Sequence, residues 1–248
     1  MRIILSPAKK MKIDTDFTGK TEKPVFLDDT KEILAWLKGK KKEELKEIWN
    51  CSDKIADENY KRIEDMRLSG NLTPAIISYE GIAYQYMAPA VFADEQLSYI
   101  QSNLRILSAF YGVVKPMDGV TPYRLEMQAK AKISIYKDLY EFWGDKLYEE
   151  VRDESGVFIN LASKEYYKCI DKYLTDKDRF ITCDFVEDVG GKLVTKGTYA
   201  KMARGEMVRF MAENKIENPE DIKKFDRLDY VFRKDLSKNV KFVFERKK

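Results

Sequence analysis

Two apolar segments of the sequence end in small polar or basic residues, which is where α/β proteins commonly hold ligands. The stretches IILSPAKK and FINLASKEY each read as a buried strand followed at once by a loop. Ligands collect beyond such strand ends because the loops expose backbone donors and helix N-termini. The side chains presented there are Ser6, Lys9 and Lys10 after the first strand, and Asn160, Ser163, Lys164 and Tyr166 after the second. Ser163 could instead serve only as the N-cap of the helix that follows.

The segment PYRLEM, residues 122–127, places an arginine beside a glutamate within an apolar stretch. Read as a strand, its alternation puts Tyr123, Leu125 and Met127 on one face and Arg124 with Glu126 on the other. Such a pair is either a solvated salt bridge at an edge or part of a site. Because desolvation offsets most of the attraction in a half-buried pair, stability is a poor reason for it, and we favour a site.

A third basic feature is the helical stretch AKMARGEMVRFM. On a helical wheel, Lys201, Arg204 and Arg209 fall on the side away from the apolar residues, and Gly205 lies among them. A missing side chain there lets a phosphate or another backbone approach closely. The alternative is a surface helix with solvated cations and a glycine needed for packing.

The residue types in the chain restrict the possible chemistry. There is no histidine, which excludes Ser-His-Asp and Cys-His nucleophile systems, and three scattered cysteines make a poor zinc site. Neither a Walker A sequence nor GxGxxG occurs. We therefore expect no metal and no cofactor. Any catalysis would use groups such as Glu126 as a proton carrier and Lys9 or Lys201 as an amine nucleophile.

The elements that must position these residues alternate between strand and helix. The pattern predicts strands at 2–5, 75–79, 157–161, 179–188 and 240–247, and helices from 94, over 137–152, after 163 and over 197–216. The chain of 248 residues has no repeat and no Gly/Ser linker. We predict one mixed α/β domain over residues 1–248, with a mixed sheet and a basic cleft, less regular than a doubly wound fold. No apolar run is long enough for a membrane helix, so we expect a cytoplasmic protein with no membrane partner. We also expect a monomer.

Several segments together resemble the bacterial peroxide stress protein YaaA family. They are, in order, LSPAKKM, LRILSAFYGVVKPMDGVTPYRLEM, FWGDKL, FINLASKEY and AKMARGEMVRFM, and the likeness runs from Met1 to about Phe244. The resemblance implies a single α/β domain with a positively charged cleft, DNA binding, and a role in limiting free intracellular iron during peroxide stress. It also implies a helix-hairpin-helix element, for which FYGVVKP is the place. That motif uses two glycines, and here Gly112 is present while Val114 holds the place of the second.

The leading hypothesis is a peroxide stress protein that binds DNA through this cleft. The net charge of only +3 does not by itself indicate nucleic-acid binding, but the local clusters of basic residues do. Phosphate contacts carry no sequence information, so we expect sequence-independent binding. The residues expected to bind DNA or another anion are Ser6, Lys9, Lys10, Arg124, Asn160, Ser163, Lys164, Tyr166, Lys201, Arg204 and Arg209. We further predict that Lys9, Arg124, Glu126, Lys201 and Arg204 converge on one concave surface.

Two other functions stay open at this point. One is an enzyme that acts on a nucleotide or damaged nucleic acid, using Lys, Glu, Ser and Tyr chemistry in the same cleft. The other is direct iron binding by carboxylates such as Asp94 and Glu95. We rank it last because the acids show no facial-triad spacing and histidine is absent.

Overall fold

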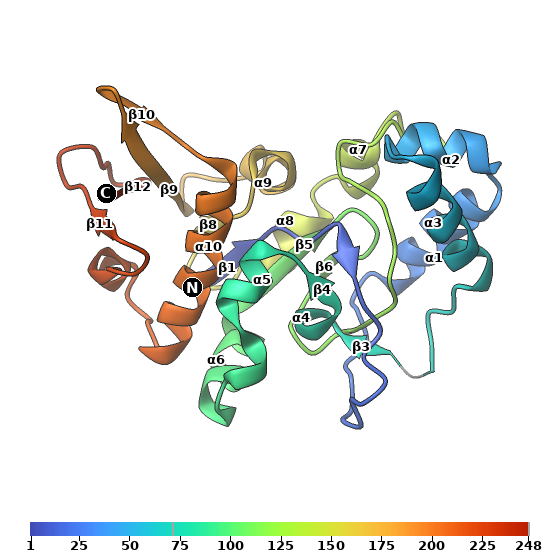
Figure 1. The fold of residues 1–248 in the computed structure, drawn as a ribbon, viewed down its shortest axis with the longest axis horizontal. Helices are drawn as coiled ribbons and strands as arrows, with labels where there is room; N and C mark the ends of the chain where they lie inside the picture. Colours follow the sequence, from blue (N-terminus) through green and yellow to red (C-terminus); the bar gives the residue numbers. More distant parts are fainter. Residues whose placement is uncertain (71, 248) are drawn as a thin grey trace.

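A mixed eight-stranded sheet forms the centre of the molecule, as Figure 1 shows. The structure is a computed structural model and describes residues 1–70 and 72–247. The strands of the main sheet are β1 (Arg2–Leu5), β5 (Leu104–Ser108), β6 (Gly112–Val114), β8 (Val157–Leu161), β9 (Arg179–Val189), β10 (Lys192–Val194), β11 (Tyr230–Phe232) and β12 (Lys241–Arg246). Two small ladders pair β2 (Lys10–Met11) with β4 (Tyr79–Glu80) and β3 (Thr73–Pro74) with β7 (Gly119–Val120).

The order of the sheet is β11-β12-β9-β8-β1-β5-β6, with β10 paired to β9. The five strands from β12 to β5 are parallel, whereas β6, β10 and β11 pair antiparallel. This mixed sheet confirms the predicted fold class. The first strand, β1, lies between β8 and β5, with Leu5 in register with both Leu161 and Ile106. Because parallel strands end at the same edge, the loops after β1 and β8 leave the sheet side by side.

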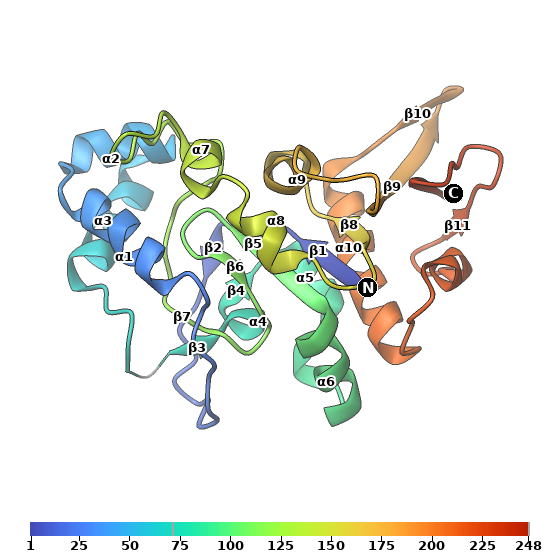
Figure 2. The same ribbon diagram turned by 180° about the vertical axis from the view of Figure 1, so that it is seen from behind.

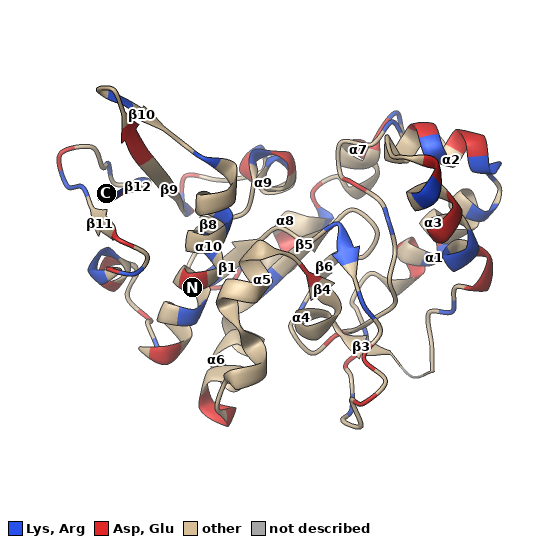
Figure 3. Cartoon of the chain, in the orientation of Figure 1, with Lys and Arg blue, Asp and Glu red and all other residues tan. Residues whose placement is uncertain are grey.

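Helices cover both faces of the sheet. They are α1 (Leu27–Lys38), α2 (Lys42–Trp49), α3 (Asp53–Asp65), α4 (Ala75–Ser78), α5 (Ile82–Met87), α6 (Asp94–Asn103), α7 (Leu139–Trp143), α8 (Lys146–Val151), α9 (Lys164–Asp171) and α10 (Gly197–Glu213), with 3-10 turns at Pro89–Val91 and Pro219–Lys224. In Figure 1, α5, α6 and α10 lie in front of the sheet, and from behind, in Figure 2, α8 and α9 do. Charged residues crowd α1–α3, whereas α5 carries none (Figure 3).

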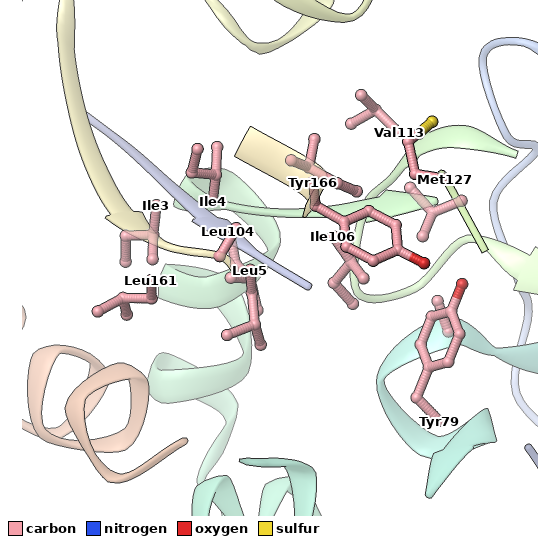
Figure 4. Close-up of a cluster of buried hydrophobic side chains, with 14 of the residues drawn as sticks. Ile3, Ile4, Leu5, Tyr79, Leu104, Ile106, Val113, Met127, Leu161 and Tyr166 are labelled. Atoms are coloured by element: carbon pink, nitrogen blue, oxygen red, sulfur yellow. The ribbon is translucent and has the colours of Figure 1, made fainter. Parts of the chain in front are cut away.

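The core lies where the central strands meet these helices. β1 supplies Ile3 and Ile4, β5 supplies Leu104 and Ile106, and β8 supplies Leu161, all fully buried. Figure 4 shows these side chains together. Each buried aliphatic side chain of this size contributes about 1.5–3 kcal/mol by leaving water. The three strands are therefore fixed firmly enough to hold the loops at their ends.

The structure corrects three local predictions. The strand predicted over 75–79 is wrong for all but its last residue. Ala75 to Ser78 make the helical turn α4, and β4 begins only at Tyr79, since a short apolar run cannot distinguish a strand from a buried helical segment. The helix predicted over 137–152 is divided into α7 and α8 at Gly144, whose φ of 54° breaks the helical path. The stretch FYGVVKP forms the turn and second strand of the antiparallel β5–β6 hairpin, so no helix-hairpin-helix lies there.

Candidate functional site

A cleft of about 410 Å³ opens at the carboxyl ends of β1 and β8. Its walls come from the loop after β1, the β4–α5 junction, the extended segment 123–126, the loop into α9, and α10. The structure brings nine of the residues predicted from sequence to it: Ser6, Lys9, Lys10, Arg124, Glu126, Ser163, Tyr166, Lys201 and Arg204. Lys9, Arg124, Glu126, Lys201 and Arg204 thus meet although about 200 positions separate the first from the last.

The segment PYRLEM is extended but joins no sheet among the described residues. Its alternation still holds: Tyr123, Leu125 and Met127 are buried, while Arg124 and Glu126 keep partial exposure and line the cleft. The side-chain pattern therefore predicted correctly which residues are buried, although the segment pairs with no strand in the part of the chain that the structure describes.

Glu126 lies between two cations. Its Oε1 is 2.8 Å from Lys9 Nζ and 3.3 Å from Arg124 Nη2. The side chains of Arg124 and Glu126 are 13% and 18% exposed, so this pair is only weakly screened by water. A second ion pair at the cleft joins Lys10 Nζ to Glu80 at 3.0 Å.

Lys201 and Arg204, both on α10, have no such partner. Among the described residues no carboxylate oxygen lies within 4.0 Å of either one. Arg204 Nε is buried and has no hydrogen-bond acceptor, and burial lowers the pKa of the Arg204 guanidinium. Arg204 is half-buried as a whole. A half-buried cation that lacks a counter-charge is costly, and an anion in the cleft would supply one.

Two serines tie the strand-end loops together. Ser6 Oγ accepts a hydrogen bond from the backbone N–H of Ser163 at 2.8 Å and donates to Ser163 Oγ at 3.2 Å. Ser163 occupies the N-cap position of α9, but its side chain makes no capping hydrogen bond. The predicted alternative, in which Ser163 only caps the helix, therefore does not describe its side chain.

Tyrosines form the apolar lining of the cleft. Tyr84, Tyr123 and Tyr166 are all buried, and the Tyr84 hydroxyl donates to Ser6 O at 3.0 Å. Tyr123 shares its hydroxyl with Tyr79 at 3.0 Å and with Ser108 at 2.7 Å. Burial raises the pKa of Tyr123 to about 12 and that of Tyr84 and Tyr166 well above the usual value, so the hydroxyls stay protonated. Figure 4 shows the hydroxyls of Tyr166 and Tyr79 at the edge of the apolar cluster.

Glu165 is a cleft residue that sequence reasoning missed. It lies in the first turn of α9 and accepts a hydrogen bond from the backbone N–H of Gln128 at 3.3 Å. Burial raises the pKa of its carboxyl, and the neighbouring charge of Glu126 adds to the shift. Its place in FINLASKEY, directly after two predicted site residues, was the available signal.

Three predicted residues are not brought to the cleft. Asn160 is buried at the end of β8, where its Oδ1 accepts from the N–H of Ala162 and its amide donates to Thr182 Oγ1. Arg209 pairs with Glu213 at 2.7 Å on α10. Lys164 lines an adjoining hollow instead. Lys164 and Arg209 lie on helices, where side chains a few positions apart point in different directions, and the sequence pattern did not resolve which of them reach the cleft.

Gly205 answers a question that the sequence left open. A Cβ at this position would lie 1.9 Å from the backbone oxygen of Ala83. The missing side chain therefore lets the backbone of α5 pack closely against α10, and it does not make room for a phosphate. This close approach sets the width of the cleft, because Ala83 of α5 and Lys201 with Arg204 of α10 line it together.

Neither a metal cluster nor a membrane span is found in the part of the chain that the structure describes. Within residues 1–70 and 72–247 no three Cys, Asp or Glu side chains are grouped to hold a metal ion. No helix there is long and apolar enough to cross a bilayer.

The fold and the cleft define an α/β protein with a pocket of tyrosines, cations and paired carboxylates at the carboxyl edge of its parallel strands. The family profile described as "Peroxide stress protein YaaA" matches residues 1–236, and the chain belongs to that family. This membership supports a general role in the oxidative stress response.

Full-length relatives carry the name "UPF0246 protein". One from Agathobacter rectalis is 68% identical over 247 residues, covering 100% of this chain and 99% of its own length. Another from Lachnoclostridium phytofermentans is 56% identical, with 98% and 96% covered, and one from Pediococcus pentosaceus is 51% identical, with 98% and 97% covered.

Proposed function

We propose that this protein acts in the peroxide stress response by binding DNA, with one unpaired nucleotide held in the cleft. The observation that carries the proposal is the pair of cations on α10, Lys201 and Arg204, which lack a carboxylate within 4.0 Å among the described residues and face a pocket lined by tyrosines. A phosphate would neutralise these cations, and a base would pack against the tyrosines.

The size of the cleft favours a single nucleotide over a duplex. Its volume of about 410 Å³ falls within the range of small-molecule pockets, which is roughly 300–1,000 Å³. A paired base cannot enter such a pocket without leaving its stack, so unpaired or distorted DNA should bind better than intact duplex. Phosphate contacts from lysine and arginine give affinity without sequence preference.

The test is Arg204→Met, with Arg209→Met as the matched control on the same helix. Removing Arg204 should lower affinity for an oligonucleotide with one unpaired nucleotide about tenfold or more. We expect no loss of melting temperature, because a half-buried charge without a partner does not stabilise the fold. Arg209→Met breaks an ion pair outside the cleft and should leave affinity unchanged. Binding of the native protein should also weaken steeply with salt, and a flat plot of log affinity against log salt would contradict the proposal.

The family resemblance extends the proposal to the cell. We propose that the protein works in the cytoplasm as a monomer and that its DNA binding helps to limit free intracellular iron. Cells that carry Arg204→Met in place of the native protein should then hold more chelatable iron after peroxide treatment. Unchanged iron with abolished DNA binding would separate the two roles.

One observation favours catalysis in the same cleft as a second candidate. Glu165, whose pKa burial raises, lies near Glu126, which two cations hold between them. Two carboxyls in such different environments suit a proton donor and a proton acceptor acting on a bound nucleotide or damaged base. Glu126→Gln and Glu165→Gln should then abolish turnover while retaining binding and stability. Equal losses of melting temperature and function would indicate structural roles instead.

A further inference from the structure

A second hollow, of about 580 Å³, adjoins the cleft, and Glu165 lines both. We name it the lysine groove, after the lysines that line it: Lys130, Lys132, Lys137, Lys164 and Lys168. Consecutive residues connect the two hollows, because Glu126 lines the cleft and Met127 the groove, while Ser163 lines the cleft and Lys164 the groove.

Two separate segments turn their lysines into the groove. In the stretch 129–133, Ala129, Ala131 and Ile133 are buried, so Lys130 and Lys132 emerge together on the exposed side. On α9, Lys164 and Lys168 are one helical turn apart and share a face. Like charges at this spacing weaken a helix by a few tenths of a kcal/mol, so helix stability does not explain them.

The lysines of the groove are poorly neutralised. Of the five groove lysines, only Lys137 has a carboxylate oxygen of any described residue within 4.0 Å, namely that of Glu141 at 3.8 Å. The acids in the groove are engaged with backbone donors: Asp138 accepts from the N–H of Glu141 at 2.8 Å, and Glu165 from that of Gln128 at 3.3 Å. The whole chain has 45 basic and 42 acidic residues, so a general surplus of cations does not account for the cluster.

We propose that the lysine groove binds the phosphates of the DNA strand that continues from the nucleotide held in the cleft. This inference rests on the proposed function and adds the path of the flanking strand. A single strand suits the groove because successive phosphates present the repeated negative charges that spaced lysines neutralise, and a flexible backbone can follow a curved surface. The groove gives affinity and direction to the strand, whereas the cleft receives the base.

The experiment compares two ligands and two double variants. Lys132→Gln with Lys168→Gln removes one lysine from each segment, and Lys234→Gln with Lys238→Gln removes two exposed lysines from the loop between β11 and β12 as the charge-matched control. For a single-stranded oligonucleotide, log affinity should fall less steeply with log salt in the groove variant. The magnitude of the slope should decrease by about 1.4, since each lost phosphate contact removes about 0.7. Its affinity for a mononucleoside 5′-phosphate should stay within about twofold of the native value, because the groove holds only the flanking strand.

The outcomes separate this inference from the proposed function. An unchanged oligonucleotide slope in the groove variant, with normal binding by the native protein, overturns the groove and leaves the cleft. An equal loss in the control variant also overturns it, because the effect is then one of net charge. If the native protein binds neither ligand, the proposed function fails and the groove fails with it.

Discussion

Gly205 offers the sharpest test of how the fold sets the cleft. In Gly205→Ala the new Cβ would lie 1.9 Å from Ala83 O and 2.7 Å from Ala83 C, whereas non-bonded heavy atoms rest at about 3.5 Å. These are backbone atoms of α5, which cannot rotate away as a side chain can. The two helices must therefore separate by more than about 1 Å, and the cleft between them must widen.

Two opposing effects decide the size of the change in stability. Alanine favours a helix interior over glycine by about 1 kcal/mol, whereas forced overpacking costs typically about 1–3 kcal/mol and more against an unyielding backbone. We expect a net loss of about 1–2 kcal/mol in the free energy of unfolding, together with weaker nucleotide binding.

Gly197→Ala is the matched control for this substitution. It lies on the same helix, and its built Cβ meets nothing within 4 Å. Urea unfolding should show a lower midpoint for Gly205→Ala and a native or slightly higher midpoint for Gly197→Ala, with equal slopes. If both variants unfold at the same midpoint, the close contact of α5 with α10 does not constrain the fold and the reasoning is refuted.

Three further substitutions test polar side chains that the fold holds in place. Burial raises the pKa of Asp118 from 3.8 to about 6, so the folded state binds the proton more tightly than the unfolded one; its stabilisation is full below about pH 4 and is lost by about pH 6. Unfolding measured across this range should show a decline of up to about 3 kcal/mol that Asp118→Asn removes, and parallel native and variant curves would contradict it. Ser6→Ala should cost about 1 kcal/mol because the N–H of Ser163 loses its acceptor, whereas Ser163→Ala, which loses only the longer hydroxyl contact, should cost less by urea unfolding; the reverse order would count against the geometry.

Local patterns in the sequence predicted much of the fold. Strong apolar runs bounded by turn residues identified β1, β8, β9 and β12, and a clean apolar face identified α10. The alternation in PYRLEM predicted which side chains are buried, since burial depends on the period of the chain and not on hydrogen-bonded neighbours. Composition alone excluded imidazole chemistry, because the chain contains no histidine.

Patterns failed where the competing structures have similar local signals. Residues 75–79 are apolar enough for a strand or a buried turn, and the turn forms because the N–H groups of Ala75 and Ile76 donate to the carbonyls of Asp118 and Pro116, far along the chain. The composition of FYGVVKP fits the turn of a helix-hairpin-helix and the turn of a β-hairpin alike. The pairing of β6 with β5 makes it a β-hairpin.

Only the tertiary structure decided which polar residues share a site. The order of the parallel strands put the loops after β1 and β8 at one edge, and the Gly205 contact brought α10 against α5. Lys201 and Arg204 therefore line the same cleft as Glu126. The same packing places Glu165 at the cleft and Lys164 at the lysine groove. A sequence determines which side of its own helix or strand a residue occupies, but distance across the fold depends on how separate elements pack, and that is settled by contacts between residues far apart in the chain.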